Sequence, residues 1–173
     1  MSSPLDVILR DARHDERTVL REFTLSAYGQ YATIMAPSAW AGLREAIVSA
    51  LSNDNDAQQI VAESNGVVLG SVLLFPSTTD AYFGIGPRAR WPEIRLLAVS
   101  PEARGLGIGK LLVNECIRRA TAAGAEAVGL HTSRSMREAI HLYESLGFMR
   151  DPTHDIHVEG AEPIDAYQRR LSR

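Results

Sequence analysis

The sequence predicts a mixed α/β (α+β) fold, a central mixed sheet flanked by helices, in one domain that spans residues 1–173. Two observations carry this prediction. Residues 59–75 contain two apolar runs joined by Asn65-Gly66, the strongest short signal for an antiparallel hairpin. Residues 93–132 then read as strand, glycine-rich turn, helix and strand, which favours a mixed sheet over a purely antiparallel one. A chain of this length can bury one core.

The first half of the chain combines a strand, two helices and the hairpin. Its predicted elements are, in order, a strand at 7–12, helices at 15–31 and 38–51, and hairpin strands at 59–64 and 67–75. Ser38 follows a proline and is the expected N-cap of the second helix. Residues 76–92 form a turn-rich loop, and loops of this length are often functional.

The second half carries the parallel unit and a final strand. Its predicted elements are a strand at 93–99, a helix from residue 108, a strand at 128–132, a helix at 136–146 and a strand within 163–171. Apolar residues recur every three or four positions along the first of these helices, and Cys116 lies within that stripe. We therefore expect a core thiol, because a reactive thiolate needs electropositive and partly exposed surroundings.

A glycine-rich segment, R-G-L-G-I-G at residues 104–109, lies between the strand and the helix. Its glycines let the backbone approach an anion, and the unpaired N–H groups of the following helix point at it, so a pyrophosphate is the natural ligand. The dinucleotide fingerprint is excluded because Lys110 stands where it needs glycine, and the Walker pattern because Arg104 and Leu111 break it. A tight turn without any ligand is the open alternative.

A second motif lies in the helix at 136–146. Its residues follow the pattern N-x-x-A-x-x-L-Y-E-x-x-G-F at Ala139, Leu142, Tyr143, Glu144, Gly147 and Phe148, with Met136 in place of the leading Asn. Together with the glycine segment, this motif resembles the GNAT superfamily of N-acetyltransferases, and its specific motifs lie between about 93 and 148. The resemblance implies the GNAT fold, in which the parallel strands at 93–99 and 128–132 splay apart and the gap holds the arm of coenzyme A.

The resemblance also implies a cosubstrate and a reaction. Acetyl-CoA would give its acetyl group to a primary amine of a small molecule or peptide, by direct transfer in a ternary complex. The residues expected to contact the coenzyme are Leu97, Ala98, Val99, Arg104, Gly105, Leu106, Gly107, Ile108, Gly109 and Lys110. A catalytically silent sensor that binds coenzyme A or acyl-CoA is the alternative function.

Two residues are the candidate catalytic groups. Glu93 is the candidate base that removes a proton from the amine, and strict alternation would place it on one strand face with Arg95, Leu97 and Val99. A rim carboxylate paired with an arginine is the alternative interpretation of Glu93, and His131 is the next candidate base. Tyr143 occupies the family position of the acid that protonates the departing thiolate; a tyrosine packed in the core is the alternative there.

Several partners are disfavoured by composition. The net charge of -3 gives no reason to expect nucleic acid. No apolar run approaches the roughly 18 residues that span a membrane, and residues 1–6 lack the blocks of a secretory signal, so we expect a cytoplasmic protein without a membrane partner. One cysteine and no cluster with zinc-ligand spacing predict that no metal is bound.

The acceptor amine is not determined by the sequence. By resemblance the two early helices form a wall of its site, where Tyr28, Tyr31 and Trp40 lie; for each of them the favoured interpretation is core or rim packing rather than ligand contact. The arginines at 88, 90 and 95 cluster beside Glu93 and would orient an acceptor that carries a carboxylate, unless they are only a solvated charge cluster. A homodimer is compatible with the sequence, which does not determine the oligomeric state.

Overall fold

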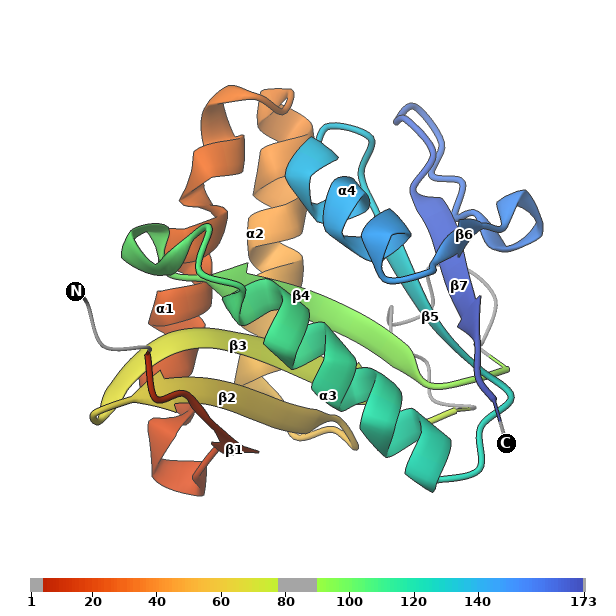
Figure 1. Ribbon diagram of the computed structural model, residues 1–173. Helices are drawn as coiled ribbons and strands as arrows, with labels where there is room; N and C mark the ends of the chain where they lie inside the picture. Colours follow the sequence, from red (N-terminus) through yellow and green to blue (C-terminus); the bar gives the residue numbers. More distant parts are fainter. Residues whose placement is uncertain (1–4, 78–89, 173) are drawn as a thin grey trace.

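The computed structural model describes residues 5–77 and 90–172 and contains a seven-stranded mixed sheet (Figure 1). The strand order is β1-β2-β3-β4-β5-β7-β6. All neighbours pair antiparallel except β4 and β5, which are parallel, so the predicted mixed sheet is confirmed. The strands are β1 (Ile8–Asp11), β2 (Gln58–Ser64), β3 (Val67–Phe75), β4 (Glu93–Val99), β5 (Ala127–Thr132), β6 (Met149–Arg150) and β7 (Asp165–Arg170).

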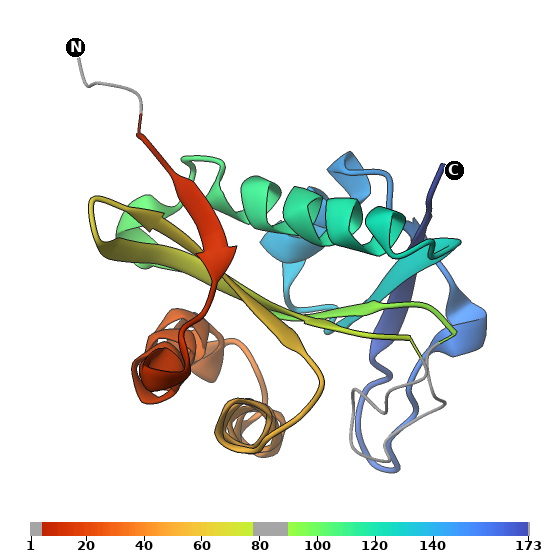
Figure 2. The same ribbon diagram turned by 90° about the horizontal axis from the view of Figure 1, so that it is seen from below.

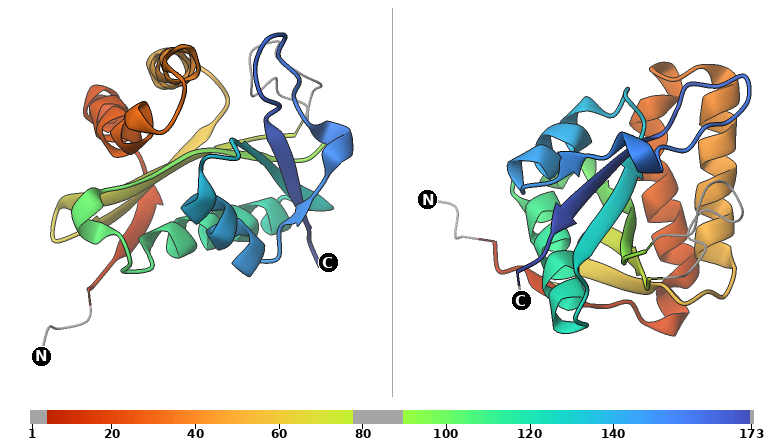
Figure 3. Two further views of the ribbon diagram at one scale, coloured as in Figure 1. Left: turned by 90° about the horizontal axis from the view of Figure 1, so that it is seen from above. Right: turned by 90° about the vertical axis from the view of Figure 1, so that its right-hand side faces the viewer.

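Helices cover both faces of the sheet, as Figures 2 and 3 show edge-on. Helices α1 (Arg17–Tyr28) and α2 (Pro37–Ser52) lie on one face, and α3 (Ile108–Ala122) and α4 (Arg137–Ser145) lie on the other. The buried apolar side chains accordingly form two clusters, one under each pair of helices. Cys116 belongs to the cluster under α3, where burial raises the pKa of its thiol to about 12, and it is confirmed as a core residue.

The hairpin is confirmed in detail. Strands β2 and β3 pair antiparallel, with Ser64 opposite Val67 across the turn. Asn65 and Gly66 both have positive φ, 50° and 78°, the backbone that a two-residue type I′ turn requires. The local signal of Asn-Gly was therefore sufficient to fix this part of the sheet.

Two helix boundaries differ from the prediction. The helix expected at 15–31 is broken into a 3₁₀ turn (His14–Glu16), α1 and a second 3₁₀ turn (Gly29–Thr33). Ser38 is not the N-cap of α2, because the helix begins one residue earlier at Pro37 and the cap position is Ala36. Proline suits the first helical position since its missing N–H would have no partner there.

One predicted feature falls mainly outside the described residues. Of the loop expected at 76–92, residues 78–89 are not described, and Arg88 of the arginine cluster lies among them. Across the two described ranges, none of the helices has the length and apolar character needed to cross a membrane.

Candidate functional site

Strand β4 contains a β-bulge in its middle. Ser71 of β3 pairs with Ala98, but Leu73 pairs with Arg95, so the two residues between them on β4 face the single Val72. Leu96 takes up the extra length with a φ of +53°, an uncommon conformation for a residue other than glycine. The bulge divides β4 into two short halves with different surroundings.

The extra residue changes which side chains share a face of the sheet. Leu97 and Val99 pack toward the cluster under α3, whereas Leu96 and Ala98 pack toward α1 and α2. The expectation that Leu97 and Val99 would lie on the face of Glu93 was therefore wrong. Strict alternation holds only for an unbulged strand, and one inserted residue reverses the pattern beyond it.

Strands β4 and β5 pair over a short distance and then separate (Figure 1). Their parallel register covers only Glu93 opposite Gly129 and Ile94 opposite Leu130. Beyond Ile94, β4 stays paired with β3 on its other side. The expected splay is thus present, and the second half of β4 has one edge open.

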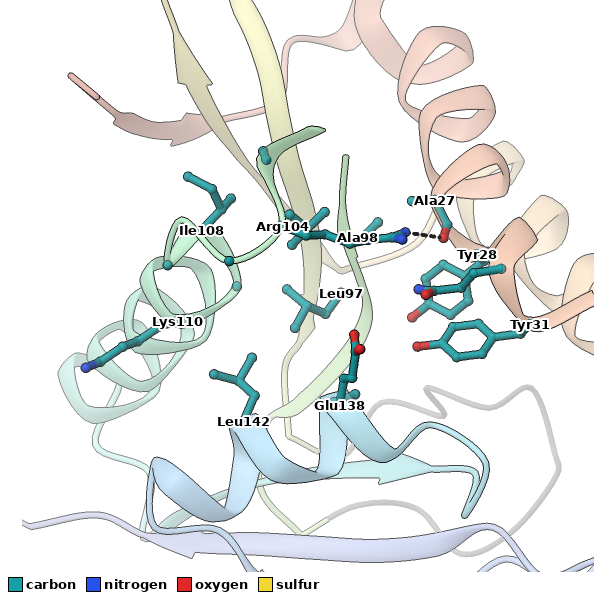
Figure 4. Close-up of a pocket in the computed structure, with 17 residues that line it drawn as sticks. Ala27, Tyr28, Tyr31, Leu97, Ala98, Arg104, Ile108, Lys110, Glu138 and Leu142 are labelled. Atoms are coloured by element: carbon teal, nitrogen blue, oxygen red, sulfur yellow. Dashed lines mark hydrogen bonds between the residues drawn. The ribbon is translucent and has the colours of Figure 1, made fainter. Parts of the chain in front are cut away.

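A pocket of about 270 Å³ lies at that open edge (Figure 4). It is lined by the second half of β4, the glycine segment, the end of α1 and one side of α4. Every residue expected to contact the coenzyme lines it except Leu106, which is 53% exposed. The lining residues that were not in that set are Ala27, Tyr28, Gln30, Tyr31, Ala103, Glu138, Ala139 and Leu142.

The glycines of the segment have two different roles. Gly105 and Gly107 have φ of +78° and +81°, and a Cβ on either would meet no atom within 4 Å, so the left-handed backbone rather than crowding requires glycine there. Gly109 instead serves packing, because its Cβ would lie 3.1 Å from Cδ2 of Leu142 on α4. Gly107 is the N-cap of α3 and provides no side-chain cap. The N–H groups of the first turn of α3 therefore stay available beside the pocket.

Arg104, which opens the glycine segment, and Lys110, which follows it, point in different directions (Figure 4). Arg104 reaches across to α1, where its guanidinium donates a hydrogen bond of 3.1 Å to the carbonyl oxygen of Ala27. Its positive charge lies beside the last turn of α1, where unsatisfied carbonyls are concentrated. Lys110 extends away from the other labelled side chains. Both residues line the pocket, and Arg104 is the one whose charged group is held by a hydrogen bond to α1.

Tyr143 lies just behind the pocket. Its neighbours Ala139 and Leu142 on α4 line the pocket, but Tyr143 is 7% exposed and packs edge-on against Phe148, with ring centroids 5.8 Å apart. Burial raises the pKa of its phenol well above the ordinary value, and the nearby Tyr31 adds to the effect. Among the described residues nothing hydrogen-bonds its hydroxyl. The phenol therefore keeps its proton at neutral pH.

Glu93 lies in the first half of β4, away from the pocket lining. It is 2% exposed, so it is not a rim carboxylate, and its Oε1 lies 2.5 Å from Nδ1 of His131 on β5. Nε2 of His131 lies 2.8 Å from the carbonyl oxygen of His154. Burial lowers the pKa of the His131 ring, but the hydrogen bond and charge of Glu93 outweigh it, so the pKa is raised above its ordinary value. The two candidate bases therefore form one pair, in which the Glu93 side chain is 2% exposed and the His131 side chain 10%.

Other parts of the site have weak or no sequence signals. Tyr28 and Tyr31 of the expected acceptor wall do line the pocket, whereas Trp40 packs against the core under α2. Glu138 was missed, although it shares one face of α4 with Leu142, four positions on. Met136, in the Asn position, is buried and accepts a contact of 3.6 Å from Oγ1 of Thr132 at its sulfur.

Comparison with known proteins points to one family. Residues 19–148 match the acetyltransferase (GNAT) family. Mycothiol acetyltransferase of Paenarthrobacter aurescens (strain TC1) is 38% identical over 65 residues, which are 38% of this chain and 20% of the relative. An uncharacterized N-acetyltransferase of Schizosaccharomyces pombe is 36% identical over 89 residues, 51% of this chain and 49% of the relative. The chain thus spans between a fifth and a half of the length of these curated relatives.

A solved structure shares the fold over nearly the whole chain. The PaiA N-acetyltransferase from Thermoplasma acidophilum, crystallised in complex with coenzyme A, superimposes with a TM-score of 0.69 at 18% identity. The alignment covers 96% of this chain and 100% of that one. At this identity the likeness establishes the fold.

Proposed function

The chain belongs to the acetyltransferase (GNAT) family, and on this premise we propose that it transfers the acetyl group of acetyl-CoA to a primary amine within a ternary complex. One observation carries the proposal. The pocket joins a glycine segment with free helix N–H groups to a strand edge that its parallel neighbour has left open. The pyrophosphate of coenzyme A fits the glycine segment, and its extended arm fits the open strand edge.

The residues present fit the coenzyme. The backbone of Gly105 and Gly107 leaves open space for a pyrophosphate, and Arg104 supplies a guanidinium suited to a phosphate oxygen. The solved PaiA structure contains coenzyme A, which supports the same ligand here. Acetyl-CoA would supply the acetyl group as a thioester.

The acceptor must lose a proton before it attacks. A free aliphatic amine has a pKa near 10, so at neutral pH a base must take its proton, directly or through water. Glu93 is the proposed base, and its burial next to His131 supports a role in proton transfer.

Two further groups serve the later steps. From Leu97 onward β4 no longer pairs with β5, so backbone N–H groups around Ala98 or Val99 can donate to the carbonyl oxygen as it gains charge. Tyr143 keeps its proton because its pKa is raised, and we assign it the protonation of the departing thiolate. The position of these groups at or just behind the pocket supports both assignments.

The decisive experiment is an assay of free thiol released from acetyl-CoA in the presence of a panel of amines. Acceptor-dependent release is expected with at least one of polyamines, amino acids, aminoglycosides or peptide N-termini. Binding of coenzyme A without release for any amine would favour the silent sensor, for which the loss of the usual Asn at Met136 is the motivating observation. The identity of the acceptor and the cytoplasmic location stay predictions.

A further inference from the structure

The hydrogen bonds of His131 determine where one proton lies. A carbonyl oxygen can only accept, so the 2.8 Å contact with His154 requires that Nε2 of His131 carry a hydrogen and donate it. The other ring nitrogen, Nδ1, lies 2.5 Å from Oε1 of Glu93. A carboxylate oxygen and a bare ring nitrogen would bring two lone pairs together at that distance. The contact must therefore contain a proton, which belongs either to the imidazolium or to the carboxylic acid.

We propose that Glu93 and His131 share this proton and work as a single proton-accepting unit for the acceptor amine, with His131 as the positioning residue. The inference rests on the proposed acetyl transfer. It replaces a lone carboxylate by the Glu93–His131 pair, whose two members lie on adjacent strands and take up and release one proton together.

The pairing reduces the difference between the pKa of the base and that of the acceptor ammonium. A lone glutamate has a pKa near 4.3, far below the value near 10 of the ammonium that it must deprotonate. A base works best when its pKa lies near the working pH. Because loss of the shared proton would leave two lone pairs in contact, the pair holds a proton more tightly than Glu93 alone would. The pair is thus a better-matched base than a single carboxylate.

The proton balance of the reaction follows. The pair acts as a base once it has released its shared proton to water. The ammonium nitrogen of the acceptor then gives one proton to the pair, directly or through water, and the freed lone pair forms the new C–N bond at the thioester carbonyl carbon. The C–S bond breaks, its electrons go to sulfur, and the thiolate takes a proton from Tyr143. The new amide nitrogen gives its second proton to water, the pair returns the proton that it accepted to water, and Tyr143 is reprotonated from solvent, so that one proton is released overall. No oxidant or further reactant is required.

The surroundings hold the pair in this geometry. The His154 that supplies the carbonyl is itself fixed, by a 2.6 Å contact of its Nδ1 with Asp151 and by the Trp91 ring 5.3 Å away. Gly129, opposite Glu93 on β5, leaves the necessary room, since a Cβ there would lie 2.8 Å from Oε2 of Glu93. The carboxylate is therefore confined from several sides.

Among residues 5–77 and 90–172, charged groups near the pair come from β4, from β6 and from the segment after β6. From the segment after β6, Asp155 raises the pKa of His131, and its own carboxylate is engaged by Arg150 of β6 at 2.7 Å and by the N–H of Ala166 at 2.7 Å. From β4, Arg95 lies two residues beyond Glu93. Because the Asp155 carboxylate is paired with Arg150, Glu93 has the larger effect of the two described carboxylates on the pKa of His131.

The kinetic test uses two substitutions at residue 131 and one matched control. His131→Asn keeps a hydrogen-bond donor near the position of Nδ1 but has no titrating group. His131→Leu has neither the donor nor the titrating group. With saturating acceptor, kcat of the wild type should fall on the acidic side with a midpoint above pH 6.5. In His131→Asn this midpoint should move about two pH units lower, toward the pKa of an ordinary glutamate. At high pH, His131→Asn should recover more turnover than His131→Leu. His141→Gln, an exposed histidine on α4, should leave the profile unchanged.

A spectroscopic measurement needs no turnover. Ring ¹⁵N shifts of His131 in the wild-type protein should show Nε2 protonated throughout, while Nδ1 loses its proton only above pH 6.5; in Glu93→Gln this step should move to lower pH. Equal titration midpoints in the two proteins would overturn the shared proton. If no amine is acetylated, the proposed function fails while the shifts still decide the pairing. If acetylation occurs but a folded His131→Asn variant has the same acidic midpoint of kcat as the wild type, the inference fails and the proposed function stands.

Discussion

The two halves of β4 differ in what surrounds them, although they belong to one seven-residue strand. The first half, at Glu93 and Ile94, is hydrogen-bonded to strands on both sides and buries a carboxylate against an imidazole. The second half, from Leu97 to Val99, has lost its neighbour β5 and lines the pocket. The bulge at Leu96 is the boundary. A closed strand pair can exclude water from proton chemistry, whereas an opened pair can accept a ligand, and one strand provides both.

The largest expected effect concerns the acid beside the open half. Tyr143→Phe removes only a hydroxyl, so coenzyme A should still bind while turnover falls by roughly 10² to 10⁴-fold, the usual cost of losing a general acid. Steady-state kinetics and equilibrium binding of coenzyme A measure the two quantities separately. Tyr167→Phe on β7, outside the pocket, is the control and should keep its turnover. Full turnover of Tyr143→Phe, with chemistry limiting the rate, would make Tyr143 a packing residue.

The next effect tests the glycine segment at the end of the open half. Gly107→Ala should weaken coenzyme A binding by about tenfold or more, because a Cβ would enter the space reserved for the pyrophosphate. Strain at positive φ is a confounding cost of roughly 1 kcal/mol. Gly66→Ala, with a φ of +78° against +81° at Gly107 and equally open surroundings in the hairpin turn, reproduces that strain without touching the pocket. If calorimetric titration finds equal affinities of Gly107→Ala and Gly66→Ala for coenzyme A, the glycine segment does not bind the pyrophosphate.

A third comparison places one methyl group against each half of β4, from Gly129 on β5 and from Gly109 on α3. Gly129→Ala would put a Cβ 2.6 Å from Nε1 of Trp91 and 2.8 Å from Oε2 of Glu93, so we expect a loss of about 1–3 kcal/mol in unfolding free energy together with reduced turnover. Gly109→Ala would put a Cβ 3.1 Å from the flexible end of Leu142 and in ordinary contact, at 3.8 Å, with Leu97 and Val99, so it should cost less than about 1 kcal/mol. Urea denaturation of both variants checks this order. If Gly109→Ala were the more damaging, the closed half would not be the tighter one.

The smallest expected effect is a pH dependence of stability that arises in the closed half. The pKa of His131 is raised in the folded protein, so its contribution to stability is fully present below its ordinary value of about 6.5 and is lost as pH rises through the folded value. The unfolding free energy of the wild type relative to His131→Asn should therefore be larger at pH 6 than at pH 9. A difference that is constant with pH would show that His131 does not titrate with the fold.

Much of the architecture could be predicted because its signals are local. The Asn65-Gly66 turn, the apolar period of α3 around Cys116 and the glycine segment each act within a few residues of the chain. The same holds for most of the coenzyme set, since residues 104–110 are contiguous and line the pocket together, with Leu106 as the exception. Backbone conformation at such sites depends on the residues themselves, and the sequence therefore determined it.

The tertiary structure alone decided how these parts meet. No local preference favours positive φ at Leu96; the bulge exists because β3 and β4 pair in a register that leaves one residue over. The contact of Glu93 with His131 joins residues 38 positions apart, and that of Arg104 with Ala27 joins residues 77 apart. Such contacts depend on the packing of the whole sheet and its helices, since strand register and splay are set by partners distant in the chain.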